Sequence, residues 1–318
     1  MLASLIFSLN STMPLFFLML LGYLLHRRQF LTDDFVAMAN KFVFHVALPV
    51  QLFRDLATMD VRASFDGPYV LFCAAVTTAS ILVIWGLARL LLKDKHIVGE
   101  FVQASYRSSA AILGAAFIQN IYGTSGLSGL MILGSVPLYN IFAVVILTLE
   151  SPSQDARSGM GEKLVKSLKG IVTNPILLAS RRALHGACSA CPCPPCQQDA
   201  LQPGWYDQPA GLLAIGAGFK GRAALGYLKP TAVATVIKLI LLPAIFLPVA
   251  VRLGFVDQKL VALMVMLGSV TTPAGYVMAK QMGHEGTLTG SVCVTTTFFS
   301  ALTLTFWVFW ARSRGYIV

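Results

Sequence analysis

The chain has 318 residues, of which 56% are hydrophobic and only 12% are charged, and its formal net charge is +10. Soluble domains usually carry about 25% charged residues, so this composition excludes a soluble enzyme, a nucleic-acid-binding protein and a disordered chain. Repeated apolar stretches instead predict an all-α, multi-pass membrane protein.

Five apolar segments fill the first half of the chain, and each is long enough to cross a bilayer as a helix. They cover residues 5–25, 35–57, 69–92, 97–122 and 126–149. A polar linker rich in Ser, Gly and charge follows at 150–169. Apolar pieces at 170–180 and 210–219 then precede full segments at 230–254, 258–281 and 287–311. We therefore expect two five-helix units, at 1–149 and 170–318.

The distribution of Lys and Arg predicts the orientation in the membrane, because cytoplasmic loops carry an excess of both. With the N-terminus outside, the inner loops hold most of these residues, and the linker 150–169 lies in the cytoplasm. Both termini then lie outside, which needs an even number of spans. We expect ten spans in the inner (plasma) membrane, provided that residues 170–219 supply two.

The two halves share landmarks at a nearly constant spacing of 161 to 163 residues. The matched pairs are Pro14 with Pro175, Pro68 with Pro230, Ser108 with Thr271, and Gly123 with Gly286. Five spans per half is an odd number, so the second half must insert upside down relative to the first. Inverted repeats of this kind are typical of secondary transporters, whose sites lie where broken helices meet near the midplane.

Residues 181–209 do not fit this pattern, because they combine dense prolines with Cys188, Cys191, Cys193 and Cys196. Prolines at this density prevent a membrane-spanning helix, so helices six and seven would be disrupted here. Three interpretations stay open: a zinc site, an extracytoplasmic disulfide loop, or a stretch read in a shifted frame. The unchanged spacing of the flanking landmarks favours the frame change, and no metal ligand is assigned.

No Asp or Glu lies in the middle of a predicted span, and no catalytic arrangement of Ser, His and Asp appears on one. A carrier built on buried carboxylates is therefore disfavoured, and we expect neither an enzyme nor a cofactor. The fourth and ninth spans carry small and hydroxylated residues at matching repeat positions, which favours unwound helices with anion-binding ends. Close helix packing is the alternative reason for such residues.

Isolated polar residues near the same depth complete the candidate site for a substrate, because charge inside a bilayer is costly and usually functional. The predicted substrate-binding residues are Arg107, Ser108, Ser109, Asn140, Lys238, Thr271, Thr272 and Pro273. For Asn140 the alternative is a bond between helices, and for Lys238 it is an amine that reaches the membrane surface.

Several motifs together resemble the auxin efflux carrier family, which includes bacterial malate and malonate permeases. They are Pro14 to Gly22, Asn40 to Pro49, Pro137 to Asn140, Thr173 to Pro175, Leu213 to Gly216, Lys238 to Pro243 and Thr272 to Ala274. The resemblance covers the chain except 181–209. It implies ten helices in two inverted five-helix repeats, crossed helices four and nine, and elevator-like carriage of small carboxylates. Arg107, Ser108 and Ser109 stand where members often have an Asn, while Asn140 matches the family's fifth-helix Asn.

We therefore expect a secondary transporter that moves a small organic anion, such as a dicarboxylate or an auxin-like carboxylate. Its partners would be this anion and the lipid bilayer, and a homodimer stays open. Two other functions also stay open: a membrane sensor that binds without transport, and a carrier inactivated by the changed segment.

Overall fold

The computed structural model describes residues 2–50, 66–123, 128–151, 204–219 and 221–317, and it contains only helical elements over these ranges. In the first half they are α1 (Leu2–Arg27), α2 (Asp33–Phe42), the π-helical turn η1 (Val43–Ala47), α4 (Gly67–Leu91), η2 (Lys95–Ile97), α5 (Val98–Tyr106), α6 (Ala110–Tyr122) and α7 (Ser128–Leu149). In the second half they are α10 (Gly204–Ala217), α11 (Gly221–Gly226), α12 (Leu228–Val236), the π-helical turn η4 (Ile237–Leu241), α13 (Leu242–Arg252), α14 (Asp257–Gly268), α15 (Pro273–Gln281) and α16 (Thr287–Ser313).

The predicted all-α class is confirmed. Four helical stretches of the described chain are long and apolar enough to cross a membrane: Gly67–Leu91, Gly129–Leu149, Leu228–Arg252 and Thr287–Ser313. The pair α14 and α15 supplies a fifth span when it is taken as one helix bent by 40°. The ten-helix inverted repeat stays a prediction, because residues 152–203 lie outside the described ranges.

The anomalous segment is partly helical. Helix α10 begins at Gly204, inside the segment, and not after residue 209 as the sequence pattern suggests. Pro209 therefore lies within the helix. The clustered cysteines and the interpretations attached to them lie outside the described residues.

Helix α4 starts where its sequence predicts. Asp66 caps it by accepting a hydrogen bond from the Tyr69 amide at 3.1 Å, and Pro68 occupies the first turn, where a missing N–H costs nothing. The same carboxylate pairs with Lys259 of α14. The Lys259 ammonium and the Tyr69 amide lower the pKa of Asp66 from its ordinary value. This pair ties the start of α4 to the start of α14.

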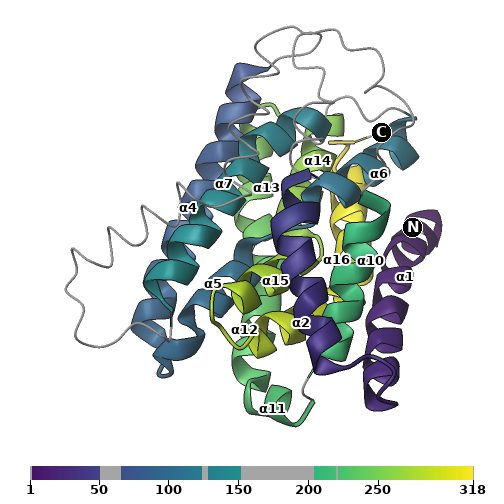
Figure 1. Cartoon of the computed structure of the whole chain (residues 1–318). Coiled ribbons are helices and arrows are strands. Elements are labelled where there is room, and N and C mark those ends of the chain that lie inside the picture. The colour runs from purple at the N-terminus through teal and green to yellow at the C-terminus, as the bar shows by residue number, and fades with distance from the viewer. Residues whose placement is uncertain (1, 51–65, 124–127, 152–203, 220, 318) are drawn as a thin grey trace, which may run out of the picture.

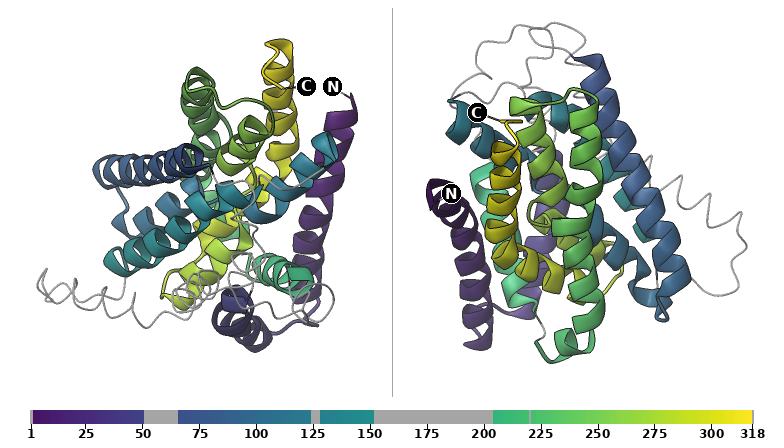
Figure 2. Two further views of the ribbon diagram at one scale, coloured as in Figure 1. Left: turned by 90° about the horizontal axis from the view of Figure 1, so that it is seen from above. Right: turned by 180° about the vertical axis from the view of Figure 1, so that it is seen from behind.

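Helices α1 and α10 run side by side along one edge of the molecule (Figures 1 and 2). Glycines allow their backbones to touch. A Cβ at Gly216 would lie 1.9 Å from the Met19 carbonyl oxygen, and one at Gly22 would lie 2.4 Å from the Leu213 carbonyl oxygen. Each helix therefore contributes one glycine to the same contact.

The half-helices α5 and α14 form the centre of the molecule. Every residue from Val98 to Tyr106 is buried, and so is every residue from Leu260 to Gly268. By contrast, α4 and α16 expose large apolar side chains on their outer faces, such as Leu71 and Phe306. A multi-pass membrane protein exposes such surfaces to lipid. The centre of this bundle is where the predicted site residues meet.

Candidate functional site at the crossing of two interrupted helices

A short extended segment separates α5 from α6, and another separates α14 from α15. Between α5 and α6, Arg107 leaves the helical region with φ −72° and ψ 125°. Between α14 and α15, Ser269 (φ −87°, ψ 175°) and Thr272 (φ −68°, ψ 139°) are extended, and Pro273 then starts α15. The interruptions fall within the fourth and ninth predicted spans.

The two interruptions are hydrogen-bonded to each other. The Ser109 amide donates to the Val270 carbonyl at 2.9 Å. The Thr271 hydroxyl donates to the Ala104 carbonyl of α5 at 2.9 Å, and the Ser108 hydroxyl donates to the Met266 carbonyl of α14. Both carbonyls belong to the last turn of a half-helix, where no intrahelical partner exists. Each interruption therefore caps the half-helix of the other.

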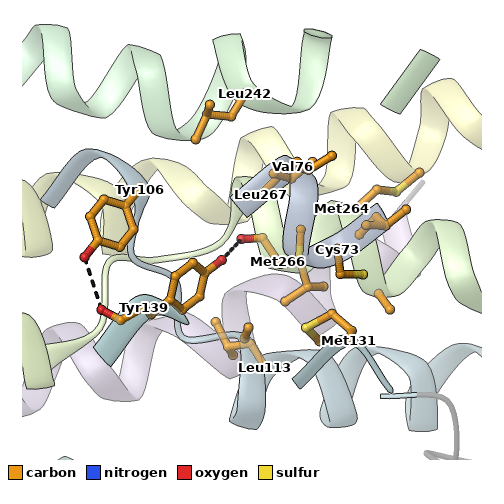
Figure 3. Close-up of a cluster of buried hydrophobic side chains, with 14 of the residues drawn as sticks. Cys73, Val76, Tyr106, Leu113, Met131, Tyr139, Leu242, Met264, Met266 and Leu267 are labelled. Atoms are coloured by element: carbon orange, nitrogen blue, oxygen red, sulfur yellow. Dashed lines mark hydrogen bonds between the residues drawn. The ribbon is translucent and has the colours of Figure 1, made fainter. Parts of the chain in front are cut away.

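Two tyrosines, Tyr139 of α7 and Tyr106 of α5, make further hydrogen bonds at the same crossing. The Tyr139 hydroxyl donates to the Met266 carbonyl at 3.3 Å, and the Tyr106 hydroxyl donates to the Tyr139 carbonyl at 3.2 Å (Figure 3). Figure 3 shows both rings beside the buried cluster that includes Cys73, Leu113 and Met131. The crossing is thus enclosed by apolar side chains, which strengthens its polar interactions.

Lys238 lies on η4, and none of its surface is exposed. Its amine donates to the Tyr106 carbonyl at 2.8 Å and also to the Ser108 hydroxyl. The Tyr106 carbonyl is at the negative C-terminal end of α5, where a cation is stabilised. The alternative of an amine that reaches the membrane surface does not hold for the described conformation. Lys238 instead donates hydrogen bonds to residues at the break between α5 and α6.

Arg107 points toward α7 and α15. One of its terminal nitrogens, Nη2, donates to Oδ1 of Asn140 at 2.7 Å, and the other, Nη1, donates to the Met278 sulfur at 3.2 Å. The Asn140 Nδ2 donates to the Val136 carbonyl at 3.2 Å. In this conformation Asn140 therefore orients Arg107, and its direct contact with a substrate stays a prediction.

The remaining predicted residues follow directly in the chain. Thr272 is half-buried and Pro273 is buried at the first turn of α15. The backbone of Thr271 is held by α16, because its amide donates to the Thr296 hydroxyl at 3.1 Å. All eight predicted residues thus lie in or next to the crossing, while their binding of a substrate stays untested.

A family model described as "Membrane transport protein" matches residues 7–176. The chain belongs to this family, the auxin efflux carrier family. The resemblance noted from the sequence motifs is confirmed.

Three relatives support the same assignment along nearly the whole chain. Each is described as "Uncharacterized transporter YfdV", from Escherichia coli K12, Escherichia coli O157:H7 and Shigella flexneri. Each is 26% identical over 317 residues, which cover 96% of this chain and 98% of the relative. The similarity to these relatives therefore extends over nearly their whole length, beyond the residues that the family model covers.

The charge balance at the crossing of this membrane transport protein is positive. Among the described residues, neither Arg107 nor Lys238 forms a salt bridge with a carboxylate. A buried acid, Glu100, lies earlier on α5, but it binds the start of α16 through the amides of Gly286 (2.7 Å) and Thr289 (3.1 Å). Its charge is stabilised there by the helix N-terminus.

Glu100 and Gln103 both lie in the predicted fourth span, and the sequence pattern gives neither of them a role. Glu100 lies near the end of that span, and its burial depends on the distant start of α16. Gln103 is fully buried, and its amide has no hydrogen-bond partner among the described residues. The position of this polar residue inside an apolar span is the sequence signal that could have indicated a functional role for Gln103.

Proposed function

We propose that this membrane transport protein is a secondary transporter that moves a small organic anion, such as a dicarboxylate or an auxin-like carboxylate. The observation that carries the proposal is the buried Arg107 guanidinium at the helix crossing. Its described partners are an amide oxygen and a sulfur, and no described carboxylate pairs with it.

The buried charge of Arg107 favours an anionic substrate that would compensate it. A guanidinium stays protonated in proteins, and a buried charge without a counter-ion is unfavourable. An anionic substrate would supply the missing negative charge. Helices α6 and α15 both start at the interruptions, so their positive N-terminal ends add to the attraction for an anion.

The reciprocal caps support an inverted repeat as the scaffold for this activity. Ser108 and Thr271 occupy matching repeat positions, and each hydroxyl caps the half-helix of the opposite repeat. This equivalence is expected when two units are related by a two-fold axis in the membrane plane. Coupling would come from the membrane potential or from a proton carried by the substrate, since no acid is assigned to the site.

The test is flux of labelled malate, malonate and indole acetate into sealed vesicles that contain the full-length protein. Asn140→Ala removes the oxygen that orients Arg107, so we expect uptake to fall about tenfold or more. Asn120→Ala is the matched control, because Asn120 is exposed at the end of α6. Equal transport by Asn140→Ala and the unmodified protein would remove Asn140 from the site.

Two other results would favour the other functions. Saturable binding without flux would indicate a sensor. Failure of the chain to insert, with rescue after an apolar stretch replaces residues 181–209, would indicate an inactivated carrier. Absence of any carboxylate flux by an inserted, folded protein would contradict the proposed transport.

A further inference from the structure

Gln103 carries a buried amide that no described residue pairs with. It lies on α5 with none of its surface exposed, and neither Oε1 nor Nε2 has a hydrogen-bond partner among the described residues. A buried polar group without a partner is unfavourable, so such groups are uncommon unless a ligand or water pairs with them. Gln103 therefore needs an explanation that the helix packing does not provide.

The amide borders the same space as Arg107. A Cβ placed on Gly275, in the first turn of α15, would lie 3.4 Å from Nε2 of Gln103 and 3.7 Å from Cδ of Arg107. The Arg107 Nε is also buried without a described partner. The Gln103 amide and the Arg107 side chain thus both approach a glycine at the positive end of α15. Three of their polar atoms, Oε1 and Nε2 of Gln103 and Nε of Arg107, have no hydrogen-bond partner among the described residues. Gly275 has no Cβ, so these two side chains face the α15 backbone directly at this position.

From this arrangement we infer that Gln103 and the Arg107 Nε form a subsite for a small carboxylate that also carries a hydrogen-bond donor. The Gln103 NH₂ group and the Arg107 Nε–H donate to the carboxylate oxygens. The Gln103 Oε1 accepts from a hydroxyl or from a second, protonated carboxyl group. This inference rests on the proposed transport of organic anions and narrows its substrate class to such acids.

Replacement of Gln103 should change stability and ligand binding in opposite directions. Gln103→Leu keeps a similar volume and removes the unpaired amide, so the folded protein should be as stable as the unmodified one or more stable. Binding of the right ligand should be weakened by the same change. A purely structural glutamine would show the opposite, because its loss would lower stability and leave ligand selectivity unchanged.

The experiment compares lactate with propionate, two acids that differ by one hydroxyl group. Binding is measured by calorimetry on the full-length protein in lipid nanodiscs. We expect the unmodified protein to bind lactate about 3- to 10-fold more tightly than propionate. Gln103→Leu should bind both acids more weakly and lose the preference for lactate. Gln103→Met provides a second variant with the same expected loss.

The matched control is Thr231→Val on α12, which removes a buried hydroxyl that also has no hydrogen-bond partner among the described residues. It should keep both affinities and their ratio. A preserved preference for lactate in Gln103→Leu, or unfolding of both Gln103 variants, would overturn the inference. Carboxylate flux without any preference for lactate would overturn this subsite alone, whereas absence of both flux and binding would overturn the proposed function as well.

Discussion

At the level of single residues, the crossing is organised by side chains that bind backbone. Lys238, Ser108 and Thr271 each donate to a carbonyl in the last turn of a half-helix. These carbonyls lack intrahelical partners, and lipid supplies none. The polar residues at the crossing therefore stabilise the interrupted helices, whereas their contact with a substrate stays a proposal.

Lys238→Met tests whether Lys238 stabilises the interrupted helix. Methionine fills a similar volume but leaves the Tyr106 carbonyl and the Ser108 hydroxyl without the amine, which we expect to cost about 1–3 kcal/mol of unfolding free energy. The measurement is unfolding of the purified protein in mixed micelles. Lys229→Met, at an exposed position on α12, is the matched control and should change stability by less than about 0.5 kcal/mol. Equal stability of the two variants would contradict a capping role for Lys238.

At the level of elements, the ends of helices decide where charge is stable. The Glu100 carboxylate accepts from the amides of Gly286 and Thr289, and from the Thr289 hydroxyl at 3.2 Å. It thereby joins α5 to the N-terminus of α16. A carboxylate at this end of a helix is favoured by the helix dipole and by unpaired N–H groups. Glu100 is thus accounted for by a structural role.

Glu100→Gln should weaken this junction. The amide offers only one acceptor atom and turns an NH₂ group toward other N–H donors, so we expect a loss of about 1–3 kcal/mol in unfolding free energy. Thermal unfolding in detergent measures the loss. The control is Glu285→Gln, because Glu285 is exposed and precedes the same helix. A variant as stable as this control would show that Glu100 does not hold α16.

At the level of the whole molecule, the direct backbone contact between α1 and α10 joins two segments that are distant in the sequence. The contact needs glycine on both sides, at Gly22 and Gly216. Tight glycine-mediated packing is a common way to associate helices where no hydrophobic effect operates between them. The packing of α1 against α10 at this edge of the molecule depends on that contact.

Gly216→Ala should force α1 and α10 apart, since the added methyl group would meet backbone that has no alternative rotamer. We expect a destabilisation of about 1–3 kcal/mol, as for other overpacked sites. Gly86→Ala is the control, because a Cβ there meets nothing within 4 Å, and alanine should be neutral or stabilising in a helix. Thermal unfolding of both variants in detergent is the measurement, and equal midpoints would show that the close contact is not needed.

Much of the helix pattern could be predicted from the sequence. The apolar segments at 69–92, 230–254 and 287–311 correspond to α4, α12 to α13, and α16 within a few residues. Apolar length and proline at helix starts are local signals, and lipid requires each span to satisfy its own backbone. The start of α10 inside the proline-rich segment was missed, because proline density was interpreted as preventing any helix there.

The sequence by itself determined that this protein crosses a membrane by apolar helices, and it indicated which two helices are interrupted, because composition and residue pairs at a constant spacing record both. Only the tertiary structure decided what the polar residues do. Asn140 holds Arg107, Lys238 caps α5, and Gln103 lies beside Gly275 without a hydrogen-bond partner in the described part of the chain. These hydrogen bonds join residues 33 and 132 positions apart in the sequence. They depend on how the helices cross, and no local pattern encodes that geometry.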